Sequence, residues 1–146
     1  MNAAPTASAP PPVLRRLGPP LAALAAVAIP AGYVAVVDPN TRGHYPDCPF
    51  LTATGWWCPG CGGLRCVHAL AHGDLTGALH DNAVAVLLFG VLAVLWLRWG
   101  WAALTGGPSP RVSVGARRWA LILLLVLVFT VVRNLPVGAG LAPQLV

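Results

Sequence analysis

The sequence contains no lysine and no glutamate, and charged side chains make up only 9% of its 146 residues. An ordinary soluble domain carries about 25% charged residues. Nine arginines and four aspartates are therefore too few to cover a water-exposed surface. The hydrophobic fraction of 57% also excludes a chain that is disordered throughout, because disorder requires low hydrophobicity and high charge. The composition predicts a membrane protein.

Several motifs of known enzymes and nucleic-acid-binding proteins are missing as well. The chain has no phosphate-binding loop, no nucleic-acid-binding motif and no Ser-His-Asp arrangement with convincing spacing. Its Cys-x-x-Cys pair has no βαβ pattern around it, which excludes a thioredoxin fold. The net charge of +5 does not indicate a nucleic-acid partner, because the arginines lie beside apolar runs. The sequence therefore predicts neither a cofactor nor a defined enzymatic activity.

Long apolar runs predict three transmembrane helices, since a helix needs about 20 apolar residues to cross a bilayer. These helices are residues 21–37, 83–104 and 119–135, and they separate a disordered Pro/Ala-rich tail (1–20), a loop (38–82), a linker (105–118) and a second tail (136–146). The first run can also be interpreted as a cleaved signal peptide. The apolar run continues well past the weak cleavage site at 26–28, which favours a retained helix.

The placement of arginine predicts the orientation of these helices. The first tail holds two arginines and the 105–118 linker holds three, whereas the 38–82 loop holds two arginines and all four aspartates. The positive-inside rule then places the first tail and the linker in the cytoplasm, and the loop outside. The loop contains all four cysteines, so we expect them to face an oxidising compartment at the cell membrane.

The loop carries a distinctive set of short motifs. They read Cys48-Pro-Phe, Thr54-Gly-Trp-Trp-Cys58-Pro-Gly-Cys61-Gly, Arg65 and Gly73-Asp-Leu, and Arg133-Asn-Leu-Pro follows near the end of the chain. With these elements the sequence resembles an uncharacterised bacterial membrane family, the domain of unknown function 2752, over roughly residues 38–136. It departs from the family pattern at Leu64, at Ala83 and by the extra Cys66. The family carries no established activity, so the resemblance implies a membrane topology and leaves the function open.

A short amphipathic helix is expected directly after the cysteine pair. Pro59-Gly60 favours a tight turn, and the apolar residues that follow have helical spacing, at Leu64, Val67, Ala71 and Leu75. A neighbouring stripe is polar and consists of Cys61, Arg65, His68 and His72. This pattern predicts a helix lying at the outer membrane interface. The predicted fold is therefore an all-α membrane protein with three transmembrane helices and one interfacial helix after a Cys-Pro-Gly-Cys turn.

Three interpretations of Cys48, Cys58 and Cys61 remain open. The oxidising compartment favours a disulfide between Cys48 and one of the other two. A redox pair of Cys58 and Cys61 is the second, because a helix N-terminus and Arg65 would lower the thiol pKa. A metal site formed by the three cysteines and an outside ligand is the third and weakest. Histidines of the helical stripe cannot join it, because they lie about 10 Å or more along the helix from Cys61.

Other polar residues have a structural interpretation beside a functional one. Arg65 could bind a lipid phosphate or another anion, or extend to the interface. Arg133 could likewise contact an anion or a lipid, pair with Asp74 or Asp81, or extend to the interface. Both aspartates are also good helix caps. His68 and His72 are spaced for a metal pair, but a solvated polar face explains them better.

Two classes of function follow from these features. The favoured one is a non-enzymatic membrane module whose disulfide-braced outer loop contacts a membrane protein partner or another copy of the chain. The alternative is a membrane thiol–disulfide or metal-handling protein that uses Cys58 and Cys61. We favour the first, because three short helices offer few polar groups within the bilayer and no visible substrate pocket.

Overall fold

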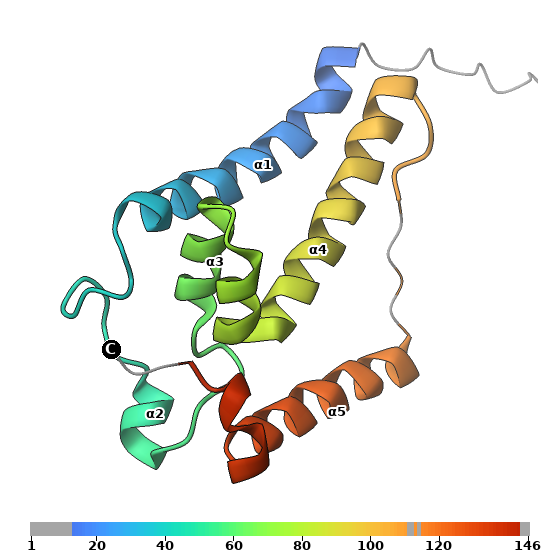
Figure 1. Cartoon of the computed structure of the whole chain (residues 1–146). Helices are drawn as coiled ribbons and strands as arrows, with labels where there is room; N and C mark the ends of the chain where they lie inside the picture. Colours follow the sequence, from blue (N-terminus) through green and yellow to red (C-terminus); the bar gives the residue numbers. More distant parts are fainter. Residues whose placement is uncertain (1–12, 111–112, 114, 144–146) are drawn as a thin grey trace, which may run out of the picture.

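The computed structural model describes residues 13–110, 113 and 115–143, and within these ranges it contains helices and no strand. The elements are α1 (Val13–Val36), α2 (Pro49–Thr54), α3 (Gly63–Ala71), α4 (Leu75–Thr105), α5 (Ala116–Arg133) and a 3₁₀ helix, η1 (Pro136–Leu141). Figure 1 shows α1 and α4 as two long arms, with α3 between them and α5 set apart at the base of α4. The predicted all-α class is confirmed for the described residues.

Two of these helices, α1 and α4, are long and apolar enough to cross a membrane. They contain most of the first predicted span and all of the second. The third predicted span, 119–135, overlaps α5, which carries three arginines within its 18 residues. This helix is not among the candidate spans, so its passage through a membrane stays a prediction.

Helix α1 begins at Val13, well before the predicted start at residue 21. The predicted disordered tail is therefore wrong for residues 13–20, and its first twelve residues lie outside the described part. Two prolines inside the helix, Pro19 and Pro20, should cost about 3 kcal/mol each in a helix interior. Tertiary contact offsets part of this cost, because Pro20 is buried and its carbonyl accepts a hydrogen bond from the indole Nε1 of Trp96 at 2.8 Å.

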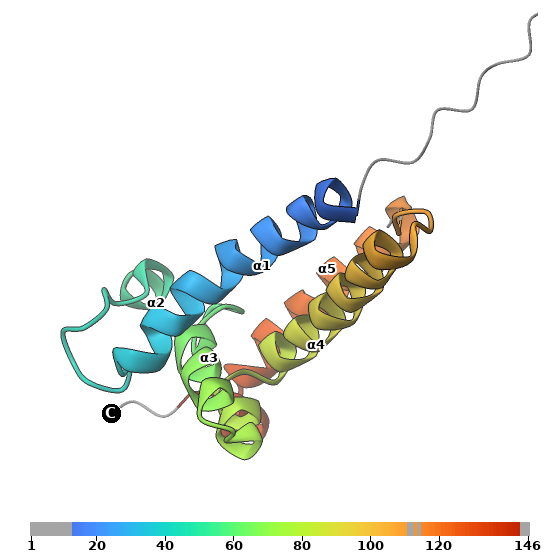
Figure 2. The ribbon, with the colours of Figure 1, turned by 90° about the horizontal axis from the view of Figure 1, so that it is seen from above.

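Helix α3 packs against both α1 and α4 (Figures 1 and 2). Cys66, the cysteine outside the family pattern, is completely buried on this helix. The ring of His68 contacts the end of α1, where its Nδ1 lies 2.9 Å from the carbonyl oxygen of Val34. The predicted helix therefore exists, but it is packed between two long helices and does not lie apart from them on a surface.

Helix α4 consists of two helical segments joined at Asn82, whose backbone is extended (φ −164°, ψ 92°). The side-chain Oδ1 of Asn82 accepts a hydrogen bond from the N–H of Ala85 at 3.0 Å, so Asn82 caps the long second segment. Asp74 caps the first segment in the same way, by accepting from the N–H of Gly77 at 2.8 Å. The change of direction at Asn82 places its side chain beside the cysteine loop.

Candidate functional site

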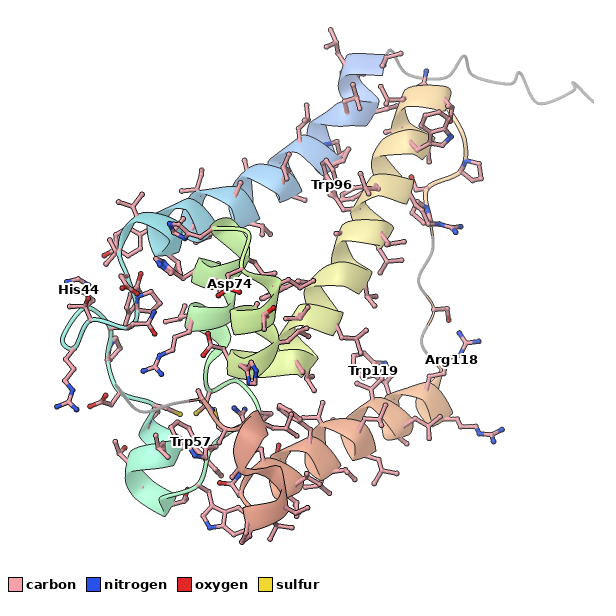
Figure 3. All side chains as sticks on the ribbon, in the orientation of Figure 1. His44, Trp57, Asp74, Trp96, Arg118 and Trp119 are labelled. Carbon is pink, nitrogen blue, oxygen red and sulfur yellow. The ribbon has the colours of Figure 1, made fainter. Side chains whose placement is uncertain are left out.

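The three cysteines that the sequence singled out lie together. Cys48 immediately precedes α2, and Cys58 and Cys61 lie in the loop between α2 and α3. The Sγ atoms of Cys58 and Cys61 are 2.9 Å apart, those of Cys48 and Cys58 are 3.6 Å apart, and all three lie within 4.8 Å of one another (Figure 3, sulfur in yellow). A disulfide needs about 2.05 Å, so the predicted disulfide is absent and these cysteines are free thiols.

Arg133, at the end of α5, holds the loop in place of a disulfide. Its guanidinium is only 1% exposed and lies 4.8 Å from the ring centroid of Phe129. Nη1 donates to the carbonyl of Cys58 at 3.0 Å, and both Nη atoms donate to the carbonyl of Cys61 at 3.2 Å. Nη2 also reaches the main-chain carbonyl of Asp81 at 3.5 Å. A cation therefore ties the cysteine turn to α4 and α5.

Two asparagines complete this clamp on the loop. The amide Nδ2 of Asn82 donates to the carbonyls of Pro59 and Cys61, at 2.8 and 3.1 Å. Asn134 bonds to both main-chain groups of Trp57: its Oδ1 accepts from the N–H at 2.7 Å and its Nδ2 donates to the carbonyl at 2.9 Å. These bonds satisfy inward-facing groups of a loop that has no strand or helix of its own.

The backbone at Gly62 brings the loop into close contact with α4. Gly62 has a φ of +83°, and a Cβ at this position would collide with the main-chain carbonyl of Asp81. Only glycine adopts this conformation without strain and also allows the contact. Gly62 also separates Cys61 from α3, which begins at Gly63. Cys61 was predicted to begin this helix. The prediction is wrong, because the helix begins at Gly63, after the turn at Gly62.

Cys48 and Cys61 differ in acidity, and Cys61 does not have the lowered pKa that was predicted for it. Cys48 occupies the N-cap position of α2, and a hydrogen bond from the N–H of Leu51 lowers the pKa of its thiol. Burial, together with hydrogen bonds with Cys58 and Cys48, raises the pKa of Cys61 to about 12. Burial also raises the pKa of Cys66. The helix N-terminus that favours a thiolate is thus that of α2, and it acts on Cys48.

We expect this order to appear in the pH dependence of alkylation. A lowered pKa leaves more thiolate on Cys48 than an ordinary thiol has at neutral pH, and the thiolate is the reacting form. Iodoacetamide should therefore modify Cys48 first as the pH rises from 6 to 9, while Cys61 stays protonated and buried. Peptide mass spectrometry of the reduced protein measures both sites in one sample. Modification of Cys61 before Cys48 would contradict the assignment.

The structure gives the other predicted residues different surroundings. Arg133 bonds to main-chain carbonyls, and among the described residues no carboxylate forms an ion pair with it. It is buried as well, so neither predicted alternative describes it in this structure. Asp81 instead interacts electrostatically with Arg65. The anion-binding role expected for the two arginines thus has no geometric support at Arg133.

The two histidines of α3 do not form an open metal pair. Their rings are 4.3 Å apart between centroids. The Nδ1 of His72 lies 2.9 Å from the carbonyl of His68, and the Nδ1 of His68 contacts the carbonyl oxygen of Val34. The Nε2 of His68 lies 3.8 Å from a carboxylate oxygen of Asp38. These contacts fix α3 to the segment that follows α1, which is a structural role.

Sequence reasoning missed the two asparagines that hold the site. Asn134 lies within the Arg-Asn-x-Pro motif, and Asn82 follows Asp81, which was a candidate residue. Neither asparagine was a candidate itself, because its side chain is uncharged and not nucleophilic. Their value comes from pairing with main-chain groups far along the chain, and for Asn134 and Trp57 the separation is 77 residues. The one available signal was the position of Asn134 directly after Arg133. A charged residue is costly in an apolar helix and therefore indicates a functional or structural contact.

Comparison with protein families gives one match. Residues 48–96 match the model of a family described as "Protein of unknown function (DUF2752)". The matched segment includes the cysteine cluster, α3 and the first part of α4, and it is shorter than the stretch over which the motifs suggested a resemblance. Comparison with curated proteins and with solved structures finds no match. The resemblance that the cysteine motifs predicted is therefore confirmed over residues 48–96.

Proposed function

We propose that this chain is a membrane protein whose cysteine cluster, Cys48, Cys58 and Cys61, binds a thiophilic divalent metal ion such as Zn²⁺. The observation that carries this proposal is the convergence of three free sulfurs from two segments within 4.8 Å. The alternative class predicted from the sequence thus gains support. The disulfide-braced binding surface loses its main support, since the thiols are free.

The spacing of the sulfurs suits a metal after a small adjustment. Zinc binds cysteine sulfur at about 2.3 Å, and two corners of such a tetrahedron lie about 3.8 Å apart. The separation of 3.6 Å between Cys48 and Cys58 is close to this value, and the pair at 2.9 Å has to open by about 1 Å. Three protein ligands leave the fourth position for water or another ligand, as in zinc sites that exchange or activate a bound molecule.

The charge of Arg133 favours a divalent ion. A buried guanidinium is costly unless an opposite charge lies nearby. Its Nε has no hydrogen-bond partner among the described residues, and it interacts electrostatically with Cys61 and Cys58. Three thiolates around a divalent ion carry one net negative charge, which the guanidinium offsets. A monovalent ion in the same place would leave one negative charge unbalanced.

The membrane assignment rests on α1 and α4, the two candidate spans. We infer that α5 is a third span, with the cysteine cluster on the outer side and the α4–α5 linker in the cytoplasm. The supporting observation is the arginine distribution, which concentrates positive charge at the start of α1 and around the linker. The lipid bilayer is then a partner of the exposed apolar faces, and a protein partner or a second copy remains a prediction from the sequence.

A second candidate function is thiol–disulfide exchange by Cys58 and Cys61. The observation that favours it is their 2.9 Å separation, which must close by about 0.9 Å to form a disulfide. The three-thiol arrangement favours metal, because a redox pair needs only two of these sulfurs and gives no role to the third.

A titration of the reduced full chain in detergent tests the proposal. Co²⁺ serves as the probe, because thiolate ligands give it intense charge-transfer absorption, and Zn²⁺ should then displace it at one ion per chain. Serine variants of Cys48, Cys58 and Cys61 should each weaken binding. The matched control is Cys66→Ala, which removes a buried cysteine outside the cluster and should bind like the wild type. Retained affinity in Cys48→Ser would contradict a three-sulfur site, and a readily cycling Cys58–Cys61 disulfide without metal binding would favour the second candidate.

A further inference from the structure

A large apolar groove lies between α1 and α4, away from the cysteine cluster. Its volume is about 1060 Å³, at the upper end of the range of about 300–1,000 Å³ for ligand pockets. Figure 3 shows Trp96, one of the lining residues, between the two helices. Apolar side chains of α1, α3 and α4 line it, including Leu24, Val27, Val67, Leu70, Leu92 and Trp96.

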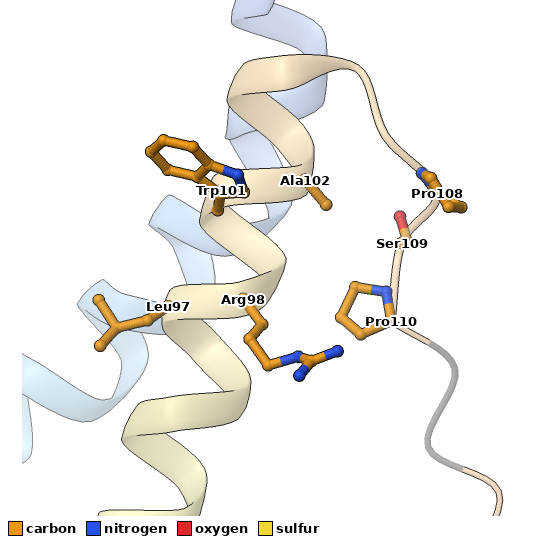
Figure 4. A pocket seen from close by; sticks show the side chains of 7 residues that line it. All are labelled: Leu97, Arg98, Trp101, Ala102, Pro108, Ser109 and Pro110. Carbon is orange, nitrogen blue, oxygen red and sulfur yellow. The ribbon is translucent and has the colours of Figure 1, made fainter.

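The groove borders a second hollow that contains an arginine. Ser109 and Pro110, at the start of the linker, line the apolar groove and also a second hollow of about 670 Å³. Arg98 lines that hollow, and Figure 4 shows its guanidinium extending toward Pro110. The side chain of Arg16 lies against Gly106 at the same end of α4. The apolar groove thus meets, at Ser109 and Pro110, a hollow that contains the exposed side chain of Arg98.

We propose that the groove holds an acyl chain of an anionic phospholipid, with the lipid phosphate at Arg98. An elongated apolar space with a cation at one end matches an amphiphile with a negative head. The proposed topology places Arg98 near the cytoplasmic surface, where a phosphate would lie, and directs the groove toward the bilayer centre. The inference rests on the membrane assignment proposed above and is independent of metal binding.

Helix α5 of a second copy is a poorer occupant. It is apolar and largely exposed along its length, but it begins with Arg117 and Arg118. In a parallel dimer these arginines would lie at the same membrane surface as Arg98. Like charges would then meet at the polar end of the groove, where a phosphate instead finds an opposite charge.

Native mass spectrometry of the full chain in detergent tests the headgroup contact. Phosphatidylglycerol and phosphatidylcholine with identical acyl chains are added in separate titrations. We expect tighter retention of phosphatidylglycerol, and Arg98→Gln should weaken it roughly five- to tenfold. The matched control Arg118→Gln removes an exposed arginine of α5 and should retain the lipid. Equal retention of both lipids, with no effect of Arg98→Gln, would overturn the contact with phosphate.

A pair of tryptophan variants tests the groove itself. Ala93 lines the groove on α4, so Ala93→Trp should fill it and reduce the retention of both lipids. Ala25→Trp places the same side chain on the opposite face of α1 and should have little effect. Unchanged retention in Ala93→Trp, or a crosslink from α5 to the groove of a second copy, would overturn the proposal. A chain with Cys48, Cys58 and Cys61 all replaced by serine should still retain lipid, which separates this inference from the metal site.

Discussion

Arg133→Met should lower the free energy of unfolding by about 2–4 kcal/mol. The guanidinium donates to the carbonyls of Cys58 and Cys61, and hydrogen bonds from charged groups are worth about 1.5–3 kcal/mol each. Methionine has a similar length but no donor, so it leaves these carbonyls with fewer partners. Part of this loss of stability is offset, because folding of the variant no longer requires the desolvation of a charged side chain. Unfolding by SDS in mixed micelles measures the difference.

Two further variants separate the clamp from a general effect of charge. Arg118→Met removes an exposed arginine of the same helix and should change stability by less than about 0.5 kcal/mol. Arg133→Lys keeps the charge without the planar set of donors, so it should restore only part of the stability. Equal stability of Arg133→Met and the wild type would show that the loop does not depend on this contact.

Asn82→Asp should also be destabilising, by about 1–3 kcal/mol, because attraction between the new carboxylate and the buried Arg133 offsets only part of the loss. The carboxylate can still accept from the N–H of Ala85, so the helix cap survives. It cannot donate to the carbonyls of Pro59 and Cys61, which would face a negative oxygen where the amide now lies. Each buried acceptor left without its partner costs about 1–3 kcal/mol. Thermal unfolding in detergent, followed by circular dichroism, reports the loss.

The matched control is the reverse substitution, Asp74→Asn, at the N-cap of the first segment of α4. Asp74 caps the first segment from an exposed position, where its side chain accepts a hydrogen bond from the N–H of Gly77. Asn and Asp are nearly equivalent N-caps, so Asp74→Asn should change stability by less than about 0.5 kcal/mol. If both variants behave alike, Asn82 acts as a cap and its contacts with the cysteine loop contribute little.

Sequence patterns predicted the parts of this fold that depend on local composition. Apolar runs located α1, most of α4 and α5, and the helical spacing of apolar residues after the cysteine turn located α3. The start of α1 was predicted wrongly, because Pro19 and Pro20 have a low helix propensity. The contact that stabilises this part of the helix joins Pro20 to Trp96, which is 76 residues further along the chain. Such a contact depends on how two helices meet, which no local pattern encodes.

The candidate site was predicted in its members but not in its chemistry. The motifs identified Cys48, Cys58 and Cys61, and the structure brings these three together. Oxidising surroundings favoured a disulfide, because sequence reasoning had no other means of bracing the loop. Carbonyl groups that receive donors from Arg133 and Asn82 provide that bracing. Every residue has the same main-chain carbonyl acceptor. The residue types in the sequence therefore did not indicate which carbonyls Arg133 and Asn82 would contact.

The position of Arg133 in the chain also bears on the order of biosynthesis. Arg133 follows Cys58 by 75 residues. At about 5–20 residues per second, a ribosome needs roughly 4–15 seconds to reach it after making the first cysteine of the pair. During that interval the cysteine loop lacks its final anchor, and its thiols are open to oxidants and to wrong pairing. The nascent chain is therefore more vulnerable than the finished protein, and fast translation of the second half protects it.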